Sequence, residues 1–138
     1  MRTLLIAVGN PLRRDDGAAR RTLELLGGTR AVVQLTPEIA SEIAAYDRVF
    51  FLDAAAEPGE PRVEPVMPNP ETGALAHAFT ATAIVGMAQQ LYGFRGAAFL
   101  CRIPGADFGI GEGLSATAEA NAAAAARLME RLMPALTE

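Results

Sequence analysis

Short apolar runs alternate with longer amphipathic segments along the chain. Residues 3–8 are almost entirely apolar and are followed by Gly9-Asn10-Pro11, a pattern typical of a strand that is buried on both faces and ends in a turn. Similar runs predict further strands at residues 31–35, 48–53 and 97–103, with residues 62–66 as an edge strand in a stretch rich in proline and glycine.

The segments between these strands carry apolar residues at helical spacing. In the first of them, Ala19, Leu23 and Leu26 form one stripe before Gly27-Gly28 ends the pattern. Thr36 before Pro37, and Ser115, are predicted helix N-caps. We therefore expect helices from the Asp15-Asp16 pair to Leu26, over 38–46 and 78–92, and after Ser115, the last one packing through Ala118, Ala122, Ala125, Leu128, Met129 and Leu132.

This alternation of strands and helices predicts the α/β class. The expected architecture is a three-layer sandwich, phosphorylase/hydrolase-like, in which helices flank a mostly parallel central sheet. A chain of 138 residues, 51% of them hydrophobic, suits a single domain over residues 1–138. In such sheets, ligands bind beyond the carboxyl ends of the strands, so residues that follow strands are the first candidates for a site.

Composition and charge narrow the range of partners. The formal net charge of -4 provides no basic surface, which disfavours nucleic acid and anionic membranes as partners. No stretch approaches the roughly 20 apolar residues of a membrane-spanning helix. The single cysteine, Cys101, lies in an apolar run and is predicted to be buried without a disulfide, which favours a reducing compartment, the cytoplasm.

Two acidic residues follow the first predicted strand. The loop of residues 9–14 should return across the carboxyl edge of the sheet before Asp15 and Asp16. One carboxylate can cap the next helix while the other faces the crevice at this edge. Alternatively, both are caps, which is the commoner role of acidic residues at a helix start.

Asp53 and His77 follow strands further along the chain. Asp53 ends the apolar run 49–52 and should lie where a buried strand emerges at the same edge of the sheet. A carboxylate there is costly unless it is paired or bound to a cation, but it can also orient a loop by accepting backbone N–H groups. His77 is the only histidine, and a lone histidine is more often a surface residue than a metal ligand.

Together, Asp16, Asp53 and His77 predict a metal site. Each comes from a different connection between a strand and a helix, and all should reach one edge of the sheet. Two carboxylates and an imidazole suit a borderline divalent ion such as nickel or zinc and leave coordination positions open. Asp16 and Asp53 are also compatible with an aspartic dyad.

Other chemistries have less support in the sequence. It contains no G-x-G-x-x-G, P-loop, H-E-x-x-H or G-x-S-x-G motif. A Cys-His pair would need Cys101, which is predicted in the middle of a buried strand, where thiols are normally inert.

Several segments resemble the hydrogenase maturation protease family. Residues 9–17, Gly-Asn-Pro-Leu-Arg-Arg-Asp-Asp-Gly, resemble its opening motif G-N-x-L-x-x-D-[DE]-G, although Ala19 stands where the family often has a second glycine. Residues 49–54 resemble its apolar strand ending in Asp-Ala, and His77 falls where the family has a histidine before a helix. Residues 111–115 are similar to its Leu-Ser helix start, so the likeness spans nearly the whole chain in order.

This resemblance implies an endopeptidase that removes a C-terminal extension from the nickel-loaded precursor of a hydrogenase large subunit. Asp16 matches the acidic metal-contacting residue of the family, Asp53 its strand-end carboxylate and His77 its imidazole ligand, and these would also be the catalytic residues. The implied metal is not a permanent cofactor, because the precursor supplies the nickel. Either a carboxylate activates water, as in an aspartyl protease, or the metal polarises the scissile carbonyl.

Two other functions are compatible with the same residues. One is a non-catalytic chaperone or binding protein that docks a metalloprotein precursor without cutting it. The other is an ordinary α/β domain in which Asp16 and Asp53 are only caps and loop anchors.

Overall fold

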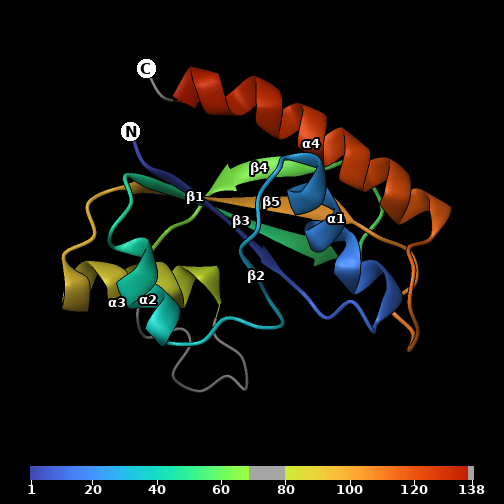
Figure 1. Cartoon of the computed structure of the whole chain (residues 1–138), viewed down its shortest axis with the longest axis horizontal. Coiled ribbons are helices and arrows are strands. Elements are labelled where there is room, and N and C mark those ends of the chain that lie inside the picture. Colours follow the sequence, from blue (N-terminus) through green and yellow to red (C-terminus); the bar gives the residue numbers. More distant parts are fainter. Residues whose placement is uncertain (69–79, 137–138) are drawn as a thin grey trace.

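A mostly parallel five-stranded sheet forms the middle layer of the protein in the computed structural model, which describes residues 1–68 and 80–136 (Figure 1). The strand order is β2-β1-β3-β5-β4, and only the pair of β4 with β5 is antiparallel. The strands are β1 (Thr3–Val8), β2 (Ala31–Val32), β3 (Arg48–Ala55), β4 (Arg62–Pro65) and β5 (Ala97–Pro104). The predicted edge strand is therefore confirmed as β4.

Helices cover both faces of this sheet (Figure 1). On one face lie α2 (Glu38–Ile43) and α3 (Ala81–Tyr92), which contact each other, and on the other lie α1 (Ala18–Leu25) and α4 (Ala116–Leu136). A 3₁₀ turn, η1 (Arg14–Gly17), leads into α1. The predicted α/β class and three-layer sandwich with a mostly parallel sheet are confirmed.

The central strand β3 is buried on both faces, which explains why its sequence is continuously apolar rather than alternating. Val49 and Phe51 pack with α2 and α3, whereas Phe50 and Leu52 pack with α1 and α4. All of these side chains are fully buried. Successive residues of a strand point to opposite faces, so one short segment contributes to both halves of the core.

The last helix, α4, packs through the predicted stripe. Ala118, Ala122, Ala125 and Met129 are fully buried, while Leu128 and Leu132 are half-buried. Small alanine side chains allow a close approach to α1, where the Thr22 hydroxyl shares its proton between the Ala18 carbonyl of its own helix at 3.1 Å and the Ala122 carbonyl of α4 at 3.3 Å. The predicted N-cap is confirmed, because Ser115 Oγ accepts from the Ala118 N–H at 3.1 Å.

Two predicted elements are shorter than expected. The strand predicted over 31–35 stops at Val32, because β1 turns away after the Gly9 N–H has donated to the Val32 carbonyl, which leaves residues 33–35 without a partner strand. The helix predicted over 38–46 ends at Ile43, and tight turns follow it before β3 begins. Thr36 is not a side-chain cap of α2, so that part of the prediction is wrong.

The predicted glycine ends of two helices are confirmed. Gly27 (φ 76°) follows α1, and the Gly28 N–H donates to the Leu23 carbonyl, the pattern of a Schellman motif. Gly93 (φ 70°) ends α3 in the same left-handed conformation.

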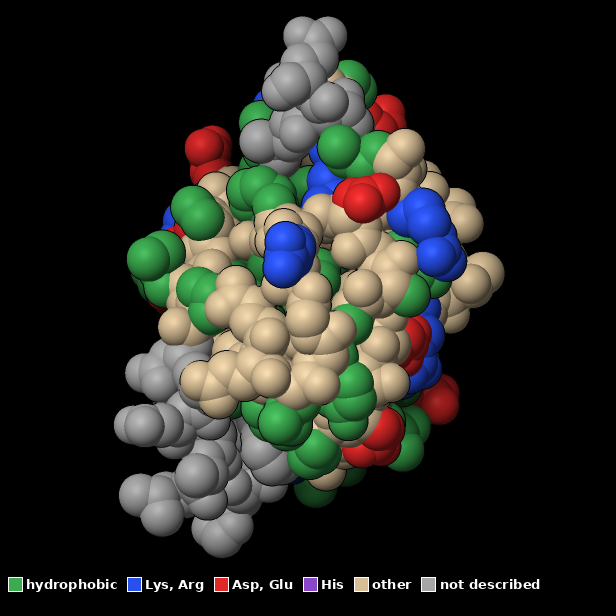
Figure 2. Space-filling model, turned by 90° about the vertical axis from the view of Figure 1, so that its left-hand side faces the viewer, with side chains coloured by type: hydrophobic (Ala, Val, Ile, Leu, Met, Phe, Trp, Pro, Cys, Tyr) green, Lys and Arg blue, Asp and Glu red, His purple; other side chains and the backbone are tan. Residues whose placement is uncertain are grey.

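Figure 2 shows the end of the molecule at which the parallel strands begin. Hydrophobic side chains and isolated charged side chains are scattered over this face without merging into one patch. None of the helices in the described part of the chain combines the length and the apolar composition that crossing a bilayer requires.

Candidate active site

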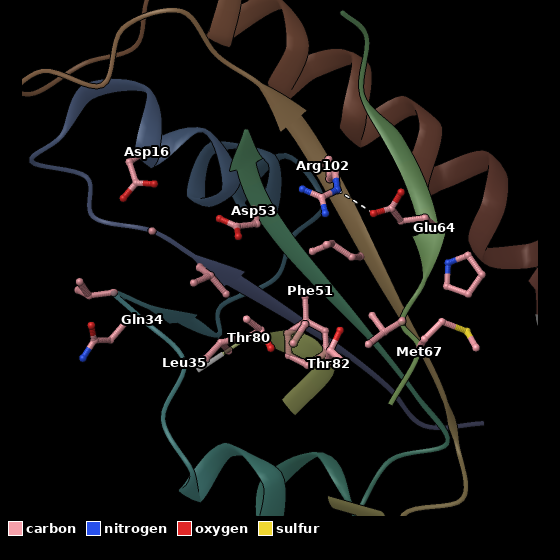
Figure 3. A pocket seen from close by; sticks show the side chains of 17 residues that line it. Asp16, Gln34, Leu35, Phe51, Asp53, Glu64, Met67, Thr80, Thr82 and Arg102 are labelled. Atoms are coloured by element: carbon pink, nitrogen blue, oxygen red, sulfur yellow. Dashed lines mark hydrogen bonds and ion pairs between the residues drawn. The ribbon is translucent and has the colours of Figure 1, made fainter. Parts of the chain in front are cut away.

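A pocket of about 620 Å³ opens at the carboxyl edge of the parallel strands, on the face covered by α2 and α3 (Figure 3). It lies where ligands of α/β sheets are expected, and its size suits a small ligand or a short peptide segment. The residues that line it are Val8, Gly9, Asp16, Val33, Gln34, Leu35, Phe51, Asp53, Glu64, Pro65, Val66, Met67, Thr80, Ala81, Thr82, Leu100 and Arg102.

The loop after β1 places Asp16 at this pocket. Asp16 Oδ2 accepts a hydrogen bond from the Asn10 N–H at 2.6 Å, which ties the 3₁₀ turn to the end of β1. Gly9 (φ 149°) passes so close to the Asp16 carbonyl that a Cβ at position 9 would overlap it. The Gly-Asn of the opening motif therefore has a physical role, because it lets the chain fold back tightly enough to aim Asp16 into the pocket.

Asp53 lies inside β3 rather than at its end. The prediction of a strand-end residue is wrong because β3 keeps pairing with β5 as far as Ala55 and Pro104. The neighbouring strand β1, however, stops opposite Asp53, at Val8. Asp53 is therefore the last residue of β3 that pairs with β1, and the pocket opens beside it.

The charge of Asp16 affects the protonation of Asp53. Burial raises the pKa of Asp53 to about 6, and the charge of Asp16 adds to the rise, while the Ala54 N–H and Arg102 oppose it. Figure 3 shows the Asp53 carboxylate directed toward the side of the pocket from which Asp16 enters. A carboxyl group with such a pKa can accept and return a proton near neutral pH.

His77, the third predicted site residue, lies outside the described residues, so its role as a ligand stays a prediction. The next described residue, Thr80, lines the pocket and caps α3, accepting through Oγ1 from the Ala83 N–H at 3.1 Å. Within residues 1–68 and 80–136, no three His, Cys, Asp or Glu side chains are grouped to hold a metal ion.

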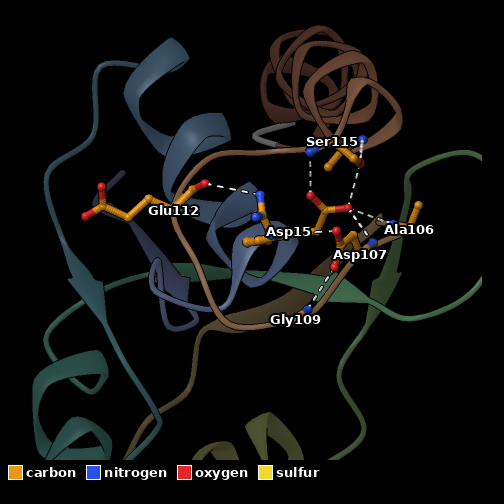
Figure 4. Close-up of polar contacts among 8 residues, drawn as sticks. Asp15, Ala106, Asp107, Gly109, Glu112 and Ser115 are labelled. Atoms are coloured by element: carbon orange, nitrogen blue, oxygen red, sulfur yellow. Dashed lines mark hydrogen bonds and ion pairs between the residues drawn. The ribbon is translucent and has the colours of Figure 1, made fainter.

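Asp15 has a different environment from its neighbour Asp16 (Figure 4). Its fully buried carboxylate accepts from the N–H groups of Ala106 and Asp107, both at 2.8 Å, and from the N–H and hydroxyl of Ser115, both at 2.7 Å. Burial by itself would raise the pKa of Asp15, but these hydrogen bonds outweigh it and hold the pKa below its ordinary value.

This network corrects the expectation that the Asp15-Asp16 pair caps a helix. Neither η1 nor α1 has a side-chain cap, and α1 begins at Ala18 after Gly17. Asp15 instead joins the loop after β1 to the loop after β5 and to the start of α4. Its carboxylate thereby links residue 15 to Ser115, 100 positions further along the chain.

Two charged pocket residues were not predicted as site residues. Arg102 Nε donates to Glu64 Oε1 at 2.7 Å, which joins β5 to the edge strand β4 (Figure 3). Arg102 is the register partner of Asp53. A basic residue near the carboxyl end of an otherwise apolar strand is a sequence signal for a site residue. Its position opposite Asp53, however, depends on the strand order of the sheet.

The prediction of an unreactive cysteine agrees with the structure. Cys101 is fully buried, and burial raises the pKa of its thiol to about 12, far above the range of a thiolate nucleophile.

Comparison with solved structures identifies the fold. A [NiFe] hydrogenase maturation protease HycI from Thermococcus kodakarensis superposes with a TM-score of 0.74 at 20% identity, covering 96% of this chain and 92% of that one. A maturation protease HybD from the same organism gives 0.68 at 24% identity over 96% and 99%. The hydrogenase maturating endopeptidase HybD from E. coli gives 0.66 at 22% identity over 99% and 93%.

Sequence comparison by itself does not place the chain in a family. No protein-family model matches the chain, and no curated protein matches it. The similarity therefore lies in the three-dimensional arrangement, which extends over almost the full length of both chains in each superposition. This chain has the fold of the hydrogenase maturation proteases.

Proposed function

We propose that this protein is an endopeptidase that removes a C-terminal extension from the nickel-loaded precursor of a hydrogenase large subunit. The observation that carries the proposal is the meeting of Asp16 and Asp53 in one pocket at the carboxyl edge of the sheet, in this fold. Fold by itself does not determine activity, so the pocket chemistry has to support it. A cytoplasmic location fits the proposal, because the single cysteine is buried without a partner.

Asp53 suits the role of a general base. With a pKa of about 6, its carboxyl group is mostly ionised at neutral pH and can take a proton from an attacking water molecule. The same carboxylate, with Asp16 and His77, can instead bind the nickel ion carried by the precursor. Asp16 favours the second role, because two neighbouring carboxylates lower the cost of bringing a positive charge into the pocket.

The apolar part of the pocket suits a peptide substrate. Phe51, Leu35 and Leu100 form its inner wall, while Val33 and Met67 at its rim are 56% and 74% exposed. Exposed apolar side chains beside a polar centre can bind the side chains that flank a scissile bond. Binding along this wall would hold the bond near Asp53, the kind of positioning that accelerates a hydrolytic step.

Nickel would act here as a signal that the precursor is complete. Asp16, Asp53 and His77 provide at most part of a coordination shell, so binding is strong only when the precursor supplies the ion and its other ligands. Cleavage would then depend on metal loading without a metal resident in the enzyme.

The test is to incubate the protein with nickel-loaded and nickel-free precursor and to measure the mass of the large subunit. We expect loss of a C-terminal peptide from the loaded precursor only, and loss of this processing in Asp16→Asn, Asp53→Asn and His77→Ala. Equal processing of both precursors would contradict the role of nickel. A stable complex with an intact precursor would instead identify a non-catalytic chaperone.

A further inference from the structure

Arg102 is the single basic side chain among the described residues that line the pocket. It lies on β5 opposite Asp53 of β3, and adjacent strands are about 4.8 Å apart. Both side chains project from the sheet face that bears the pocket. In Figure 3 the guanidinium group lies between Asp53 and Glu64.

The guanidinium of Arg102 retains unused donors. It bonds Glu64 through Nε alone, and its Nη1 and Nη2 donate to no acceptor among residues 1–68 and 80–136. Arg30, by contrast, forms a two-pronged pair with Glu42 through Nε and Nη2, both at 2.8 Å. Arg48 likewise donates through both Nε and Nη1. These two arginines have the geometry of structural contacts, whereas Arg102 presents its outer nitrogens to the pocket.

Arg102 does not pair directly with Asp53. The charge of Arg102 lowers the pKa of Asp53, but no hydrogen bond or ion pair joins the two side chains. A positive donor and a carboxylate therefore face the pocket from neighbouring strands without a direct hydrogen bond between them. The carbonyl oxygen of a bound peptide can lie against Arg102, while the water molecule that attacks this carbonyl lies against Asp53.

Resting on the proposed function, we propose that Arg102 is a catalytic residue that binds the carbonyl oxygen of the scissile peptide bond and stabilises its charge in the transition state. Of the two roles open to Asp53, this step uses the general base and leaves nickel to Asp16 and His77. Water attacks the carbonyl carbon and gives a proton to the Asp53 carboxylate. The electron pair of the C=O bond moves to the oxygen, which the Nη donors of Arg102 hold. When the C–N bond breaks, the leaving nitrogen takes the proton back from Asp53, so the net reaction is addition of one water molecule.

Glu64 has a positioning role in this proposal. Its contact with Nε fixes the plane of the guanidinium and leaves Nη1 and Nη2 free. Arg62 of the same strand lies 3.7 Å from Glu64, but its short pair, at 2.7 Å, is with Glu57. Arg62 does not line the pocket, which makes it a matched control that shares Glu64 with Arg102.

The test measures single-turnover processing of nickel-loaded precursor over a range of enzyme concentrations, for wild type, Arg102→Met, Arg102→Lys, Arg102→Ala and Arg62→Met. For Arg102→Met we expect the maximal rate constant to fall about 100-fold, as for other lost oxyanion donors, with the half-saturating enzyme concentration unchanged. Arg102→Lys should retain part of the rate, and guanidinium ion below denaturing concentrations should restore part of the rate of Arg102→Ala. Arg62→Met should stay close to wild type.

Equal effects of Arg62→Met and Arg102→Met would overturn the proposal, because they would indicate that Arg102 only joins β4 to β5. A change confined to the half-saturating concentration would also overturn it, since that result describes substrate binding alone. If Arg102→Met does not fold, Arg102→Lys decides, and a wild-type rate in that variant counts against a bidentate oxyanion contact. If wild-type protein does not process the precursor, the proposed function itself fails, a result distinct from equal rates in wild type and Arg102→Met.

Discussion

Adjacent residues with identical side chains have different roles at positions 15 and 16. Asp15 is fully buried and accepts hydrogen bonds from segments about 100 residues away, whereas Asp16 is half-buried and lines the pocket. The 3₁₀ turn separates them, because successive residues of a helical turn point in different directions. A single motif therefore contains one buried carboxylate that joins distant loops and one carboxylate that lines the pocket.

At the residue scale, we expect Asp53→Asn to increase stability while abolishing processing. The folded state raises the pKa of Asp53 from 3.8 to about 6, so ionised Asp53 destabilises the folded protein. The cost is absent below pH 3.8, grows as pH rises toward about 6 and is complete above that value. Allowing for partial exposure, the amide should add about 1–2 kcal/mol to the free energy of unfolding at neutral pH. Urea unfolding across this pH range measures the gain.

The matched control for Asp53→Asn is Glu130→Gln, which removes one negative charge from an exposed position on α4. Its unfolding free energy should stay within a few tenths of a kcal/mol of wild type. If Asp53→Asn shows no gain at neutral pH, or a gain that persists unchanged at acidic pH, then burial does not disfavour the ionised form of Asp53 as we infer.

Gly9 offers a second prediction at the residue scale. Gly9→Ala should destabilise the protein by about 1–3 kcal/mol and slow processing, because the new Cβ overlaps the Asp16 carbonyl and displaces the site carboxylate. Gly59→Ala is the control, since Gly59 also has a positive φ (127°) but open space where the Cβ would lie. Thermal unfolding and processing rates are measured for both variants. Backbone strain should affect both, whereas overlap with the Asp16 carbonyl should affect Gly9→Ala alone. Equal effects in the two variants would show that the close approach to Asp16 is unimportant.

At the scale of elements, Asp15 joins the β1–α1 loop, the loop after β5 and the N-terminus of α4 (Figure 4). The backbone adds to this junction, since the Asp15 N–H donates to the Asp107 carbonyl at 2.9 Å and the Arg14 N–H to the Gly111 carbonyl at 3.0 Å. The loop after β5 is thereby held against the loop that carries Asp16. A local sequence motif thus depends on contacts made by the last third of the chain.

We expect Asp15→Asn to lower the free energy of unfolding by about 2–4 kcal/mol, because an amide places its own donors against the buried N–H groups. The lowered pKa of Asp15 contributes stability above its unfolded-state value near 3.8, and this is lost as pH falls through the folded-state pKa. Wild type should therefore lose more stability in acid than Asp15→Asn. Urea unfolding measures both effects, with Glu112→Gln in the same loop as an exposed control. Identical acid profiles of wild type and Asp15→Asn would refute the role of Asp15.

At the scale of the whole molecule, the pocket lies at one end of β3, and a buried arginine that stabilises the fold, Arg48, lies at the other. Arg48 begins the strand and donates to Thr3 Oγ1 and to the Met133 carbonyl, both at 2.7 Å, which holds the end of α4 to the sheet. Its guanidinium also lies over the Phe50 ring, 5.5 Å from the centroid. Asp53 is about 17 Å further along the strand. The stabilising contacts of Arg48 are therefore far from the pocket.

This separation predicts that Arg48→Met destabilises the protein by about 2–3 kcal/mol but leaves the processing rate constant unchanged at temperatures where the variant is folded. Thermal unfolding gives the first quantity, and single-turnover processing gives the second. The pattern is the opposite of that expected for Asp53→Asn. A rate that falls in proportion to stability would indicate that the two ends of the sheet are coupled.

The periodicity of the sequence was sufficient to predict most elements and the fold class. The apolar run 3–8 matches β1 to the residue, and the N-cap Ser115, the edge strand at 62–66 and the glycine helix ends are as expected. These features depend on local preferences that a few neighbouring residues determine. The end of β2 was mispredicted because it depends on where a different strand, β1, turns away.

For the site, the sequence determined which residues have suitable chemistry, and Asp16 and Asp53 do line one pocket. The tertiary structure decided that Asp15 joins the loop after β5 to the start of α4, and it placed Arg102 beside Asp53. These outcomes depend on strand order and on contacts between segments far apart along the chain. No local pattern encodes them, because hydrogen-bond partners and burial arise only when the complete sheet assembles.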